Sequence, residues 1–277
     1  MPPKLYVNAP PNGDFRAMPA RGGGYAVLKW VTSYPGNPAR GLPVVTGALL
    51  VSDDETGELV AILDCAAVTS LRTGAAAAVS ALALGRDGAA TAGIVGCGVN
   101  GSWAARCLAA VGYREGACTD VRPEAAEALA SELGWSAGPL AAALACDVVV
   151  TVTPGNEPIA DAPDLAAGRH LAVLGADGHG KAELTIPALE RCDLFCDQWE
   201  QASTGGEIAG AVEAGVVGRE DVTDLGAVLA GEVPGRTSPD QVTLFDSTGL
   251  AIQDLGIAIA VVEAWREGRV EVTEVAL

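Results

Sequence analysis

The chain has 277 residues, of which 49% are hydrophobic, so it is long enough to bury a core in one large domain or two medium ones. Its 35 glycines and low aromatic content of 4% are typical of an α/β protein whose core is built from small aliphatic side chains. The net charge of −18 repels phosphate backbones and anionic membranes, which argues against nucleic acid and membrane partners. Intrinsic disorder is excluded too, because so much apolar surface cannot remain in water.

The seven cysteines are scattered and form no C-x-x-C pair. The closest two, Cys192 and Cys196, have no neighbouring His or Cys that would complete a zinc site, so we expect no metal. An odd number of cysteines and the absence of a signal peptide predict reduced thiols and a cytoplasmic location. Every apolar run of membrane-spanning length is interrupted by Gly or charge, which predicts a soluble protein.

Short β-type runs separated by turn signals occupy the first part of the chain. These runs are Ala26–Val31, Val44–Val51 and Leu59–Leu63. Together they predict a small antiparallel or mixed sheet. An Ala-rich stretch then predicts a helix over Gly74–Leu84, for which Ser70 or Thr73 is the candidate N-cap.

From Ala92 onward the pattern changes to strands that alternate with helices, which predicts a doubly wound parallel sheet. The predicted strands are Ala92–Val95, Gly116–Thr119, Cys146–Thr153, Leu171–Leu174, Leu194–Cys196 and Val242–Phe245. Helices are predicted over Ser102–Val111, Pro123–Leu133 and Leu250–Glu267. The fold class is therefore α/β.

The sequence Gly96-Cys97-Gly98-Val99-Asn100-Gly101 lies between a predicted strand and a helical pattern, which is the context of a dinucleotide-binding loop. Gly96 allows the tight turn, Gly98 lets the backbone approach the pyrophosphate, and Gly101 permits close packing of helix on strand. The N-terminus of the helix then faces the phosphates. The alternative is an ordinary glycine-rich turn.

Asp120 stands at the end of the second predicted strand, about 20 residues beyond the loop, where the dinucleotide fingerprint expects an acid. A carboxylate there accepts hydrogen bonds from the adenosine ribose and repels a 2′-phosphate, so the sequence favours NAD over NADP. Arg122 weakens this preference, because an arginine near that position can accommodate the phosphate. The alternative is a strand-end acid without a ligand.

Two stretches carry charged side chains in specialised settings. Arg72 lies at the start of the Ala-rich helix, where it could hold a phosphate or carboxylate with two parallel hydrogen bonds, or simply be an exposed arginine. Asp177 follows the strand Leu171–Leu174, and ligands bind at the carboxyl ends of strands in open α/β sheets. Asp177 is thus a candidate acid/base, Lys181 could neutralise it or bind cofactor, and His179 is a further polar residue of the same loop. The alternative is a glycine-rich turn with solvated charges.

The stretch Phe245-Asp246-Ser247-Thr248-Gly249 precedes the predicted closing helix. Helix capping explains much of its composition, since Ser and Thr are favoured caps. A ligand contact from Ser247 is the alternative.

Four stretches, in the same order along the chain, resemble the ornithine cyclodeaminase/μ-crystallin family. They are Arg72-Thr73-Gly74-Ala75-Ala76, Gly96–Gly101, Gly175-Ala176-Asp177 with Gly180-Lys181, and Phe245-Asp246-Ser247-Thr248-Gly249. The resemblance implies that residues 89–246 form an NAD-binding Rossmann domain, inserted into a smaller α+β domain of residues 1–88 and 247–277 for substrate binding and dimerisation. It also implies a homodimer and hydride transfer between NAD and the α-carbon of an amino acid.

Residue roles follow from the resemblance by matching position. It implies that Asp177 is the catalytic acid/base and that Lys29 binds the substrate carboxylate, with Thr248 as a further substrate contact. It also implies a set of cofactor contacts: Gly96, Gly98, Val99, Asn100, Gly101, Asp120, Thr153, Arg72, Lys181 and Ser247. Arg72 could contact substrate as well. Without the resemblance, Lys29 would be interpreted as a salt-bridged strand lysine.

The family carries an additional N-terminal helix and strand at its dimer interface, which we expect this chain to lack. It also has an N-terminal arginine that binds substrate, for which Lys4 or Arg16 is the candidate replacement. The cyclodeaminase branch tends to have Glu two residues before its Met-Pro pair, whereas Arg16 precedes Met18-Pro19 here and would repel a distal ammonium.

The runs Asp14–Pro19 and Asp197–Ala202 resemble the alanine dehydrogenase branch of the family. We therefore expect an NAD-dependent enzyme that deaminates a small L-amino acid through an imine, or runs in reverse. One alternative is an ornithine or lysine cyclodeaminase or a cyclic-imine (ketimine) reductase. Another is a non-catalytic NAD(P)H-binding protein like μ-crystallin.

Overall fold

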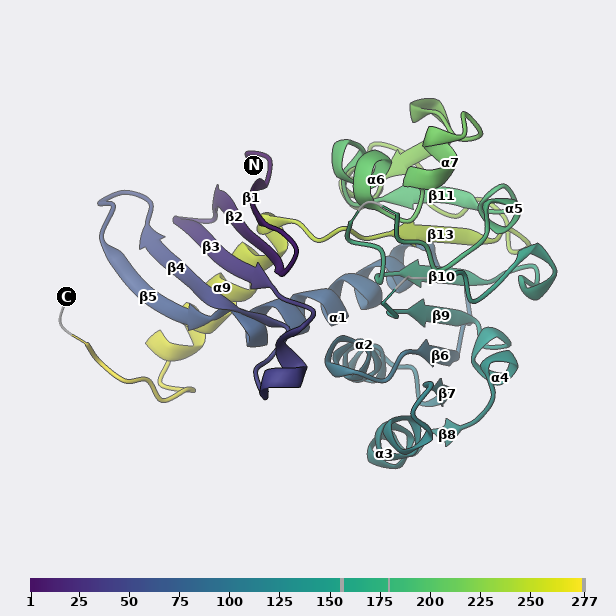
Figure 1. Cartoon of the computed structure of the whole chain (residues 1–277), viewed down its shortest axis with the longest axis horizontal. Coiled ribbons are helices and arrows are strands. Elements are labelled where there is room, and N and C mark those ends of the chain that lie inside the picture. The colour runs from purple at the N-terminus through teal and green to yellow at the C-terminus, as the bar shows by residue number, and fades with distance from the viewer. Residues whose placement is uncertain (155–156, 179, 276–277) are drawn as a thin grey trace. The chain divides into compact units, whose positions relative to one another are not determined.

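The structure is a computed structural model that describes residues 1–154, 157–178 and 180–275 (Figure 1). The chain divides into two compact units. Met1–Arg72 with Leu250–Leu277 form the first unit, and Thr73–Gly249 form the second. Each unit has its own sheet and its own apolar core.

The first unit is built on a five-stranded antiparallel sheet whose strands follow the order of the sequence. The strands are β1 (Leu5–Ala9), β2 (Gly13–Gly22), β3 (Tyr25–Ser33), β4 (Val45–Asp53) and β5 (Leu59–Asp64), with a short helix η1 (Asn37–Arg40) after β3. Helix α9 (Ala251–Arg266) packs on one face through β2 and β3. Side chains alternate between the two faces of a strand, so Lys29 is buried while its neighbours Leu28 and Trp30 are exposed.

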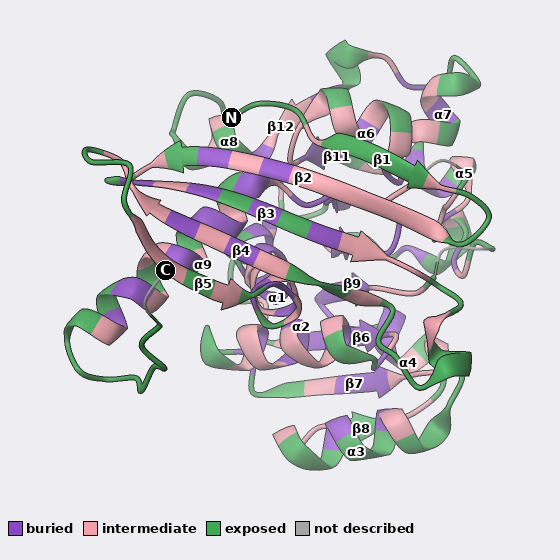
Figure 2. Cartoon of the chain, turned by 60° about the vertical axis from the view of Figure 1, so that its left-hand side comes forward, coloured by how far each residue is buried: buried purple, intermediate pink, exposed green. Residues whose placement is uncertain are grey.

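The face of this sheet opposite α9 carries exposed apolar side chains, and we call it the open sheet face. Its members are Leu5, Val7, Leu28, Trp30 and Ile62. The strand register places them on one side of the sheet, and exposed segments are visible along β1 and β3 in Figure 2. Contiguous exposed apolar surface of this kind is typical of protein–protein contacts.

The second unit is built on an eight-stranded parallel sheet with the order β12-β11-β13-β10-β9-β6-β7-β8. The strands are β6 (Thr91–Val95), β7 (Glu115–Thr119), β8 (Ser136–Ala137), β9 (Val148–Thr151), β10 (His170–Val173), β11 (Asp193–Cys196), β12 (Val222–Asp224) and β13 (Thr243–Asp246). The chain runs outward from β6 through β7 to β8, then returns to β9 and continues on the other side. This confirms the predicted α/β class with a doubly wound parallel sheet and a smaller α+β unit.

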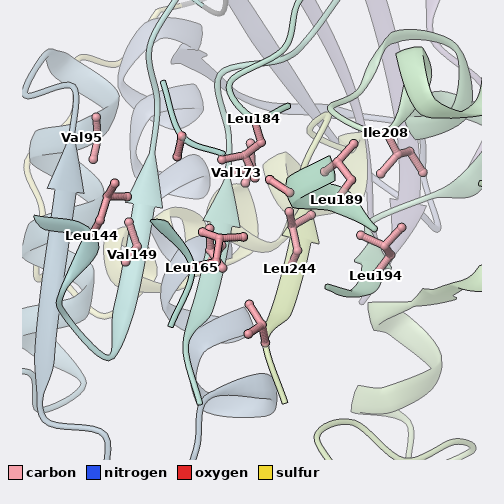
Figure 3. Close-up of a cluster of buried hydrophobic side chains, with 14 of the residues drawn as sticks. Val95, Leu144, Val149, Leu165, Val173, Leu184, Leu189, Leu194, Ile208 and Leu244 are labelled. Atoms are coloured by element: carbon pink, nitrogen blue, oxygen red, sulfur yellow. The ribbon is translucent and has the colours of Figure 1, made fainter. Parts of the chain in front are cut away.

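Helices connect the parallel strands. They are α2 (Val99–Ala110), α3 (Pro123–Leu133), α4 (Leu140–Leu144), α5 (Ile186–Leu189), α6 (Trp199–Gly205), α7 (Ala209–Glu213) and α8 (Leu225–Leu229), with the short helices η2 (Ala162–Asp164) and η3 (Arg219–Asp221). Apolar clusters cover both faces of the sheet, because alternate residues of a buried strand point to opposite sides. Val149 and Val173 belong to one cluster, shown in Figure 3, and Val148 and Ala172 to the other.

Helix α1 (Cys65–Leu84) begins well before the predicted start at Gly74. Asp64 caps it, since its Oδ1 accepts a hydrogen bond of 2.8 Å from the Ala66 amide. The predicted caps, Ser70 and Thr73, are wrong: both lie inside the helix, where the Ser70 hydroxyl donates to the Ala66 carbonyl at 2.8 Å. Tertiary burial of the first turn overrides the capping preference of these side chains.

Among the described residues, α1 is the one helix long and apolar enough, by length and composition, to cross a membrane. Of its apolar window, 56% is buried inside the protein, as in the core helix of a globular protein. Arg72 and Gly74 interrupt the apolar run.

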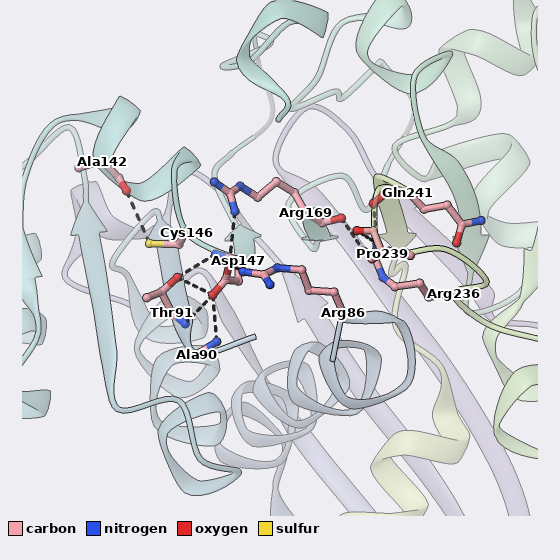
Figure 4. Close-up of polar contacts among 10 residues, drawn as sticks. All are labelled: Arg86, Ala90, Thr91, Ala142, Cys146, Asp147, Arg169, Arg236, Pro239 and Gln241. Carbon is pink, nitrogen blue, oxygen red and sulfur yellow. Dashed lines mark hydrogen bonds and ion pairs between the residues drawn. The ribbon is translucent and has the colours of Figure 1, made fainter. Parts of the chain in front are cut away.

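A polar network ties the amino-terminal edge of the parallel sheet together (Figure 4). Asp147, directly before β9, accepts hydrogen bonds from Arg86, from the Ala90 amide and from the amide and hydroxyl of Thr91. Burial alone would raise the pKa of Asp147, but these donors hold it well below its usual value. Because the loops that follow the strands lie at the opposite edge, this network stabilises the sheet rather than the candidate site.

Candidate functional site

The glycine loop that follows β6 has the backbone geometry that its sequence predicts. Gly96 has a φ of +96°, and a Cβ there would lie 2.8 Å from the Val152 carbonyl oxygen. At Gly101 a Cβ would lie 1.8 Å from the Gly96 carbonyl oxygen, so helix α2 and the loop touch through this glycine. At Gly98 a Cβ would meet no protein atom within 4 Å. The first and last glycines are therefore required by packing, whereas Gly98 leaves its surroundings open.

Gly98 is the N-cap of α2, and no described side chain caps the first-turn amides. Val99 and Asn100 follow at the helix start, with Val99 69% exposed. The N-terminus of a 12-residue helix carries a partial positive charge and outward N–H groups. The open surroundings of Gly98 and these amides fit the pyrophosphate of a dinucleotide.

Asp120 follows β7 and fixes the glycine loop to the neighbouring strand. Its Oδ2 accepts a hydrogen bond of 2.7 Å from the Cys97 amide, and its Oδ1 accepts one of 2.8 Å from the Arg122 amide. The Arg122 guanidinium Nε is 3.5 Å from Oδ1. The carboxylate thus lies beside the loop at the edge where a ribose would follow the pyrophosphate.

The carboxyl ends of β9 and β10 are joined by Glu183, a residue that the sequence reasoning missed. Its carboxylate accepts hydrogen bonds from the Thr151 hydroxyl at 2.8 Å, the Thr153 amide at 2.6 Å and the Gly175 amide at 2.8 Å. The only sequence signal is an acid two positions after Lys181, with nothing to show that it turns inward. Glu183 fixes the starts of the loops that carry Thr153 and Asp177.

A second buried acid, Glu207, holds the backbone of the segment that carries Glu183. Glu207 accepts hydrogen bonds from the amides of Glu183 and Leu184, at 2.8 Å and 2.6 Å in the shorter contacts. Burial raises the pKa of Glu183, and it raises the pKa of Glu207 to about 7. Glu183 and Glu207 are therefore carboxyl groups with an increased tendency to be protonated.

Asp177 and Lys181 form an ion pair of 2.6 Å in the loop after β10. Their side chains are 39% and 37% exposed, so the pair lies at the surface of the second unit. His179, named with them in the sequence, lies outside the described residues. A carboxylate at the end of a sheet strand is a chemically suitable acid/base, and the Lys181 ammonium fixes its position.

Ser247 and Thr248 do not cap the closing helix, so that interpretation of their sequence was wrong. Instead, both hydroxyls donate to the Asp197 carboxylate, at 3.3 Å and 2.9 Å, and the Gly249 amide donates to it at 2.7 Å. The N-cap of α9 is Leu250. Asp197, which follows β11, thus organises the loop after β13, and only its place at a strand end could have signalled this.

A buried charged cluster lies in the first unit, and we call Lys29, Arg72, Gln253 and Asp254 the Lys29 cluster. Lys29 points from β3 toward α9, where its Nζ is 2.8 Å and 3.0 Å from the two Asp254 carboxylate oxygens. Arg72 Nε is 3.6 Å from Asp254 Oδ1, and Arg72 Nη1 donates to Gln253 Oε1 at 3.4 Å. Asp254 was missed because an acid in an apolar helix pattern gives no hint of its partner.

Burial lowers the pKa of Lys29, and Arg72 lowers it further, while the Asp254 carboxylate opposes both effects. Lys29 and Asp254 have side-chain exposures of 1% and 0%, and that of Arg72 is 13%. Two cations and one carboxylate leave the cluster with one excess positive charge. Such a cluster is suited to an anionic group such as a carboxylate.

The remaining substrate candidates lie on the first two strands of the first unit. Arg16 on β2 pairs with Asp14, with Nε 2.7 Å from Oδ1, and its guanidinium lies over the Tyr6 ring, 5.4 Å from the ring centroid. Lys4 directly precedes β1. Among the described residues, no group of three or more His, Cys, Asp or Glu side chains could hold a metal ion.

The fold and the glycine loop define a dinucleotide-binding α/β protein, and comparison with known proteins defines its family. The profile of the ornithine cyclodeaminase/mu-crystallin family matches residues 1–269. The chain belongs to this family.

Individual relatives refine the comparison. An alanine dehydrogenase of Archaeoglobus fulgidus is 44% identical over 95% of this chain and 84% of the relative. The structure of an archaeal alanine dehydrogenase dimer with bound NAD matches with a TM-score of 0.93 and 42% identity, over 98% of this chain and 87% of that one. A Δ1-pyrroline-2-carboxylate reductase of Thermococcus litoralis, in complex with NADH and L-proline, matches with a TM-score of 0.90 and 26% identity, over 96% and 87%.

Proposed function

We propose that this protein is an NAD-dependent oxidoreductase that deaminates a small L-amino acid, with alanine as the first candidate. In the forward direction the amino acid, NAD⁺ and water give the 2-oxo acid, ammonium, NADH and a proton. The reverse direction is reductive amination. The observation that carries the choice is the 44% identity to an alanine dehydrogenase over nearly the whole chain.

The cofactor assignment is supported by the glycine loop. We assign the pyrophosphate to the α2 amides beside Gly98, with Val99 and Asn100 at the same helix start, and the adenosine ribose to Asp120. Thr153 and Ser247 follow strands of the same sheet and are the proposed contacts nearer the nicotinamide. When bound, NAD would supply the acceptor for the hydride that leaves the substrate α-carbon.

Substrate binding is assigned to the Lys29 cluster. Lys29 and Arg72 would hold the α-carboxylate by charge-assisted hydrogen bonds, and this fixes the direction in which the Cα–H bond points. Thr248 and either Arg16 or Lys4 are proposed to complete the binding of a small substrate.

Proton transfer is assigned to Asp177. Its carboxylate would accept a proton from the substrate amine as the imine forms and release it to solvent. It would then accept a proton from the water that attacks the imine carbon and pass it to the departing amine. Lys181 would hold the Asp177 carboxylate in place through their ion pair. Lys181 is also a candidate contact to the cofactor.

The test is a panel of L-amino acids incubated with the protein and NAD⁺, followed by the absorbance of reduced nicotinamide. Alanine should be among the substrates that produce NADH. Conversion of ornithine to proline without net NADH would contradict the dehydrogenase assignment and support a cyclodeaminase. NADH binding with no turnover of any amino acid or imine would support a non-catalytic binding protein.

A cyclic-imine reductase is the second candidate, since the likeness to the pyrroline-2-carboxylate reductase extends over 96% of the chain. Its substrate also carries a carboxylate beside the reacting carbon, which the Lys29 cluster would accept equally. Oxidation of NADH by pyrroline-2-carboxylate at a higher kcat/KM than by pyruvate with ammonia would favour it.

We also propose a cytoplasmic homodimer that forms through the open sheet face. Trp30 and Ile62 are 42% and 56% exposed there, and shielding such side chains from water favours association. Trp30→Glu should convert a dimer into a monomer in sedimentation analysis. The control Leu229→Glu, which alters an exposed leucine of the second unit, should remain dimeric.

A further inference from the structure

Asp254 is a buried acid held against two cations in the first unit. We propose that Asp254 is a positioning residue: its carboxylate holds the Lys29 ammonium and the Arg72 guanidinium together as a receptor with one net positive charge for the carboxylate of the substrate. The inference rests on the proposed function, in which the substrate carries an α-carboxylate. Asp254 itself would repel that group, so it acts through its two partners.

Asp254 holds Lys29 tightly and Arg72 loosely. Both Asp254 oxygens lie within 3.0 Å of Lys29 Nζ, so the ammonium is tightly bound. Arg72 is held more loosely: its buried Nε is 3.6 Å from Asp254 Oδ1 and forms no hydrogen bond with any described residue, and its Nη1 contact to Gln253 is a long 3.4 Å. The guanidinium therefore keeps donors that can form two parallel hydrogen bonds with a second carboxylate.

Asp254 also decides whether Lys29 stays charged. The groups around Lys29 are Arg72 and the Cys65 thiol from α1 and Asp254 from α9, while its partners across the sheet, Met18 and Leu49, are apolar. Burial and Arg72 both favour loss of the Lys29 proton, and the thiol is held neutral because burial raises the pKa of Cys65. The Asp254 carboxylate is the strong opposing charge, so without it Lys29 would become neutral at alkaline pH.

Charge balance gives the receptor its selectivity. Lys29 and Asp254 alone make a neutral pair with no reason to bind an anion. Arg72 adds the excess positive charge, and a bound carboxylate brings the buried cluster to neutrality. A ligand without a carboxylate would leave a net charge in a region of low solvent exposure, which is unfavourable.

The experiment is calorimetric titration of propionate into the protein saturated with NADH. Propionate has a carboxylate but no amine, so its binding reports on the carboxylate receptor alone. Asp254→Asn should bind propionate about tenfold or more weakly at about pH 9, because the charge-assisted hydrogen bond from Lys29 is lost, and should recover affinity at about pH 6 as Lys29 regains its proton. The wild type should show no such pH-dependent loss. Glu263→Gln, the same charge change at an exposed site on α9, should bind like the wild type.

Two further variants cover the case in which Asp254→Asn fails to fold. Asp254→Glu keeps the carboxylate and should bind propionate without the new pH dependence. Lys29→Met combined with Asp254→Leu keeps the net charge of the cluster but removes the Lys29 ammonium as a hydrogen-bond donor, and should therefore bind propionate weakly at every pH. Propionate affinity of Asp254→Asn or of the double variant equal to that of the wild type would overturn the inference, and so would a wild type that does not bind propionate.

The role of Asp254 and the proposed reaction can be refuted separately. If the wild type oxidises alanine but propionate binding is insensitive to Asp254, the positioning role is wrong and the proposed function stands. If no amino acid or imine is turned over, yet propionate binding depends on Asp254 as described, the proposed reaction is wrong and the carboxylate receptor stands.

Discussion

Gly98 and Gly101 of the nucleotide loop should respond differently to substitution by alanine. In Gly101→Ala the new Cβ would lie 1.8 Å from the Gly96 carbonyl oxygen and 3.2 Å from Val152 Cγ1, so helix and loop must separate. Overpacking of this kind costs about 1–3 kcal/mol of folding free energy. For a unit of this size, that lowers the melting temperature by roughly 2–12 °C.

In Gly98→Ala the new Cβ meets no protein atom within 4 Å, and the backbone φ of −70° suits alanine. The melting temperature should therefore change little. The methyl group would nevertheless keep the pyrophosphate from the α2 amides, and the loss of one hydrogen bond to a charged group weakens binding about 10- to 100-fold.

Thermal unfolding and titration of NADH fluorescence separate the two effects. Gly101→Ala should lose stability first and binding as a consequence, whereas Gly98→Ala should lose binding alone. Unchanged NADH affinity in Gly98→Ala would refute the assignment of the loop to the pyrophosphate. An unchanged melting temperature in Gly101→Ala would refute the close contact between helix and loop.

Three further perturbations test other parts of the account. Asp120→Ala should weaken NADH more than NADPH in fluorescence titrations, because the ribose acceptor and the charge opposing a 2′-phosphate are both lost; equal losses would argue against the ribose contact. Asp177→Asn should abolish NADH production from alanine and leave NADH affinity largely intact; unchanged turnover would remove Asp177 from the reaction. The pKa of Glu207, raised by burial to about 7 from 4.5, means that the folded state binds more protons than the unfolded state between these values. The free energy of unfolding should therefore fall as pH rises through this window, by about 3 kcal/mol from this group. In thermal melts, Glu207→Gln should flatten this dependence on pH. An unaltered slope in the variant would contradict the raised pKa of Glu207.

Much of the parallel sheet could be predicted from the sequence, because buried parallel strands are short apolar runs bounded by turns. The strand before the glycine loop and the helix Pro123–Leu133 agree with the structure closely, the latter with proline in its first turn. Strands β1 and β2 were not predicted. β1 is only five residues long and β2 is mixed in polarity and contains a proline, so it is the pairing of β1 with β2 and of β2 with β3 that defines them as strands.

Some residues of the candidate site could likewise be predicted from the sequence, and others could not. The glycine loop has local backbone requirements, so its geometry could be read from glycine spacing alone. The buried acids could not, because their roles depend on partners far away in sequence. Asp254 meets Lys29 across 225 positions, and Glu183 meets Thr151 across 32. Nothing near either acid in the sequence distinguishes it from a solvated surface residue.

The central claim is that hydride passes from the α-carbon of alanine to NAD, and isotope transfer tests it most directly. The protein should be incubated with NAD⁺ and L-alanine deuterated at Cα, and the NADH analysed by mass spectrometry. The account predicts NADH that carries one deuterium, formed together with pyruvate and ammonium. NADH without deuterium, or no NADH from alanine, would contradict it.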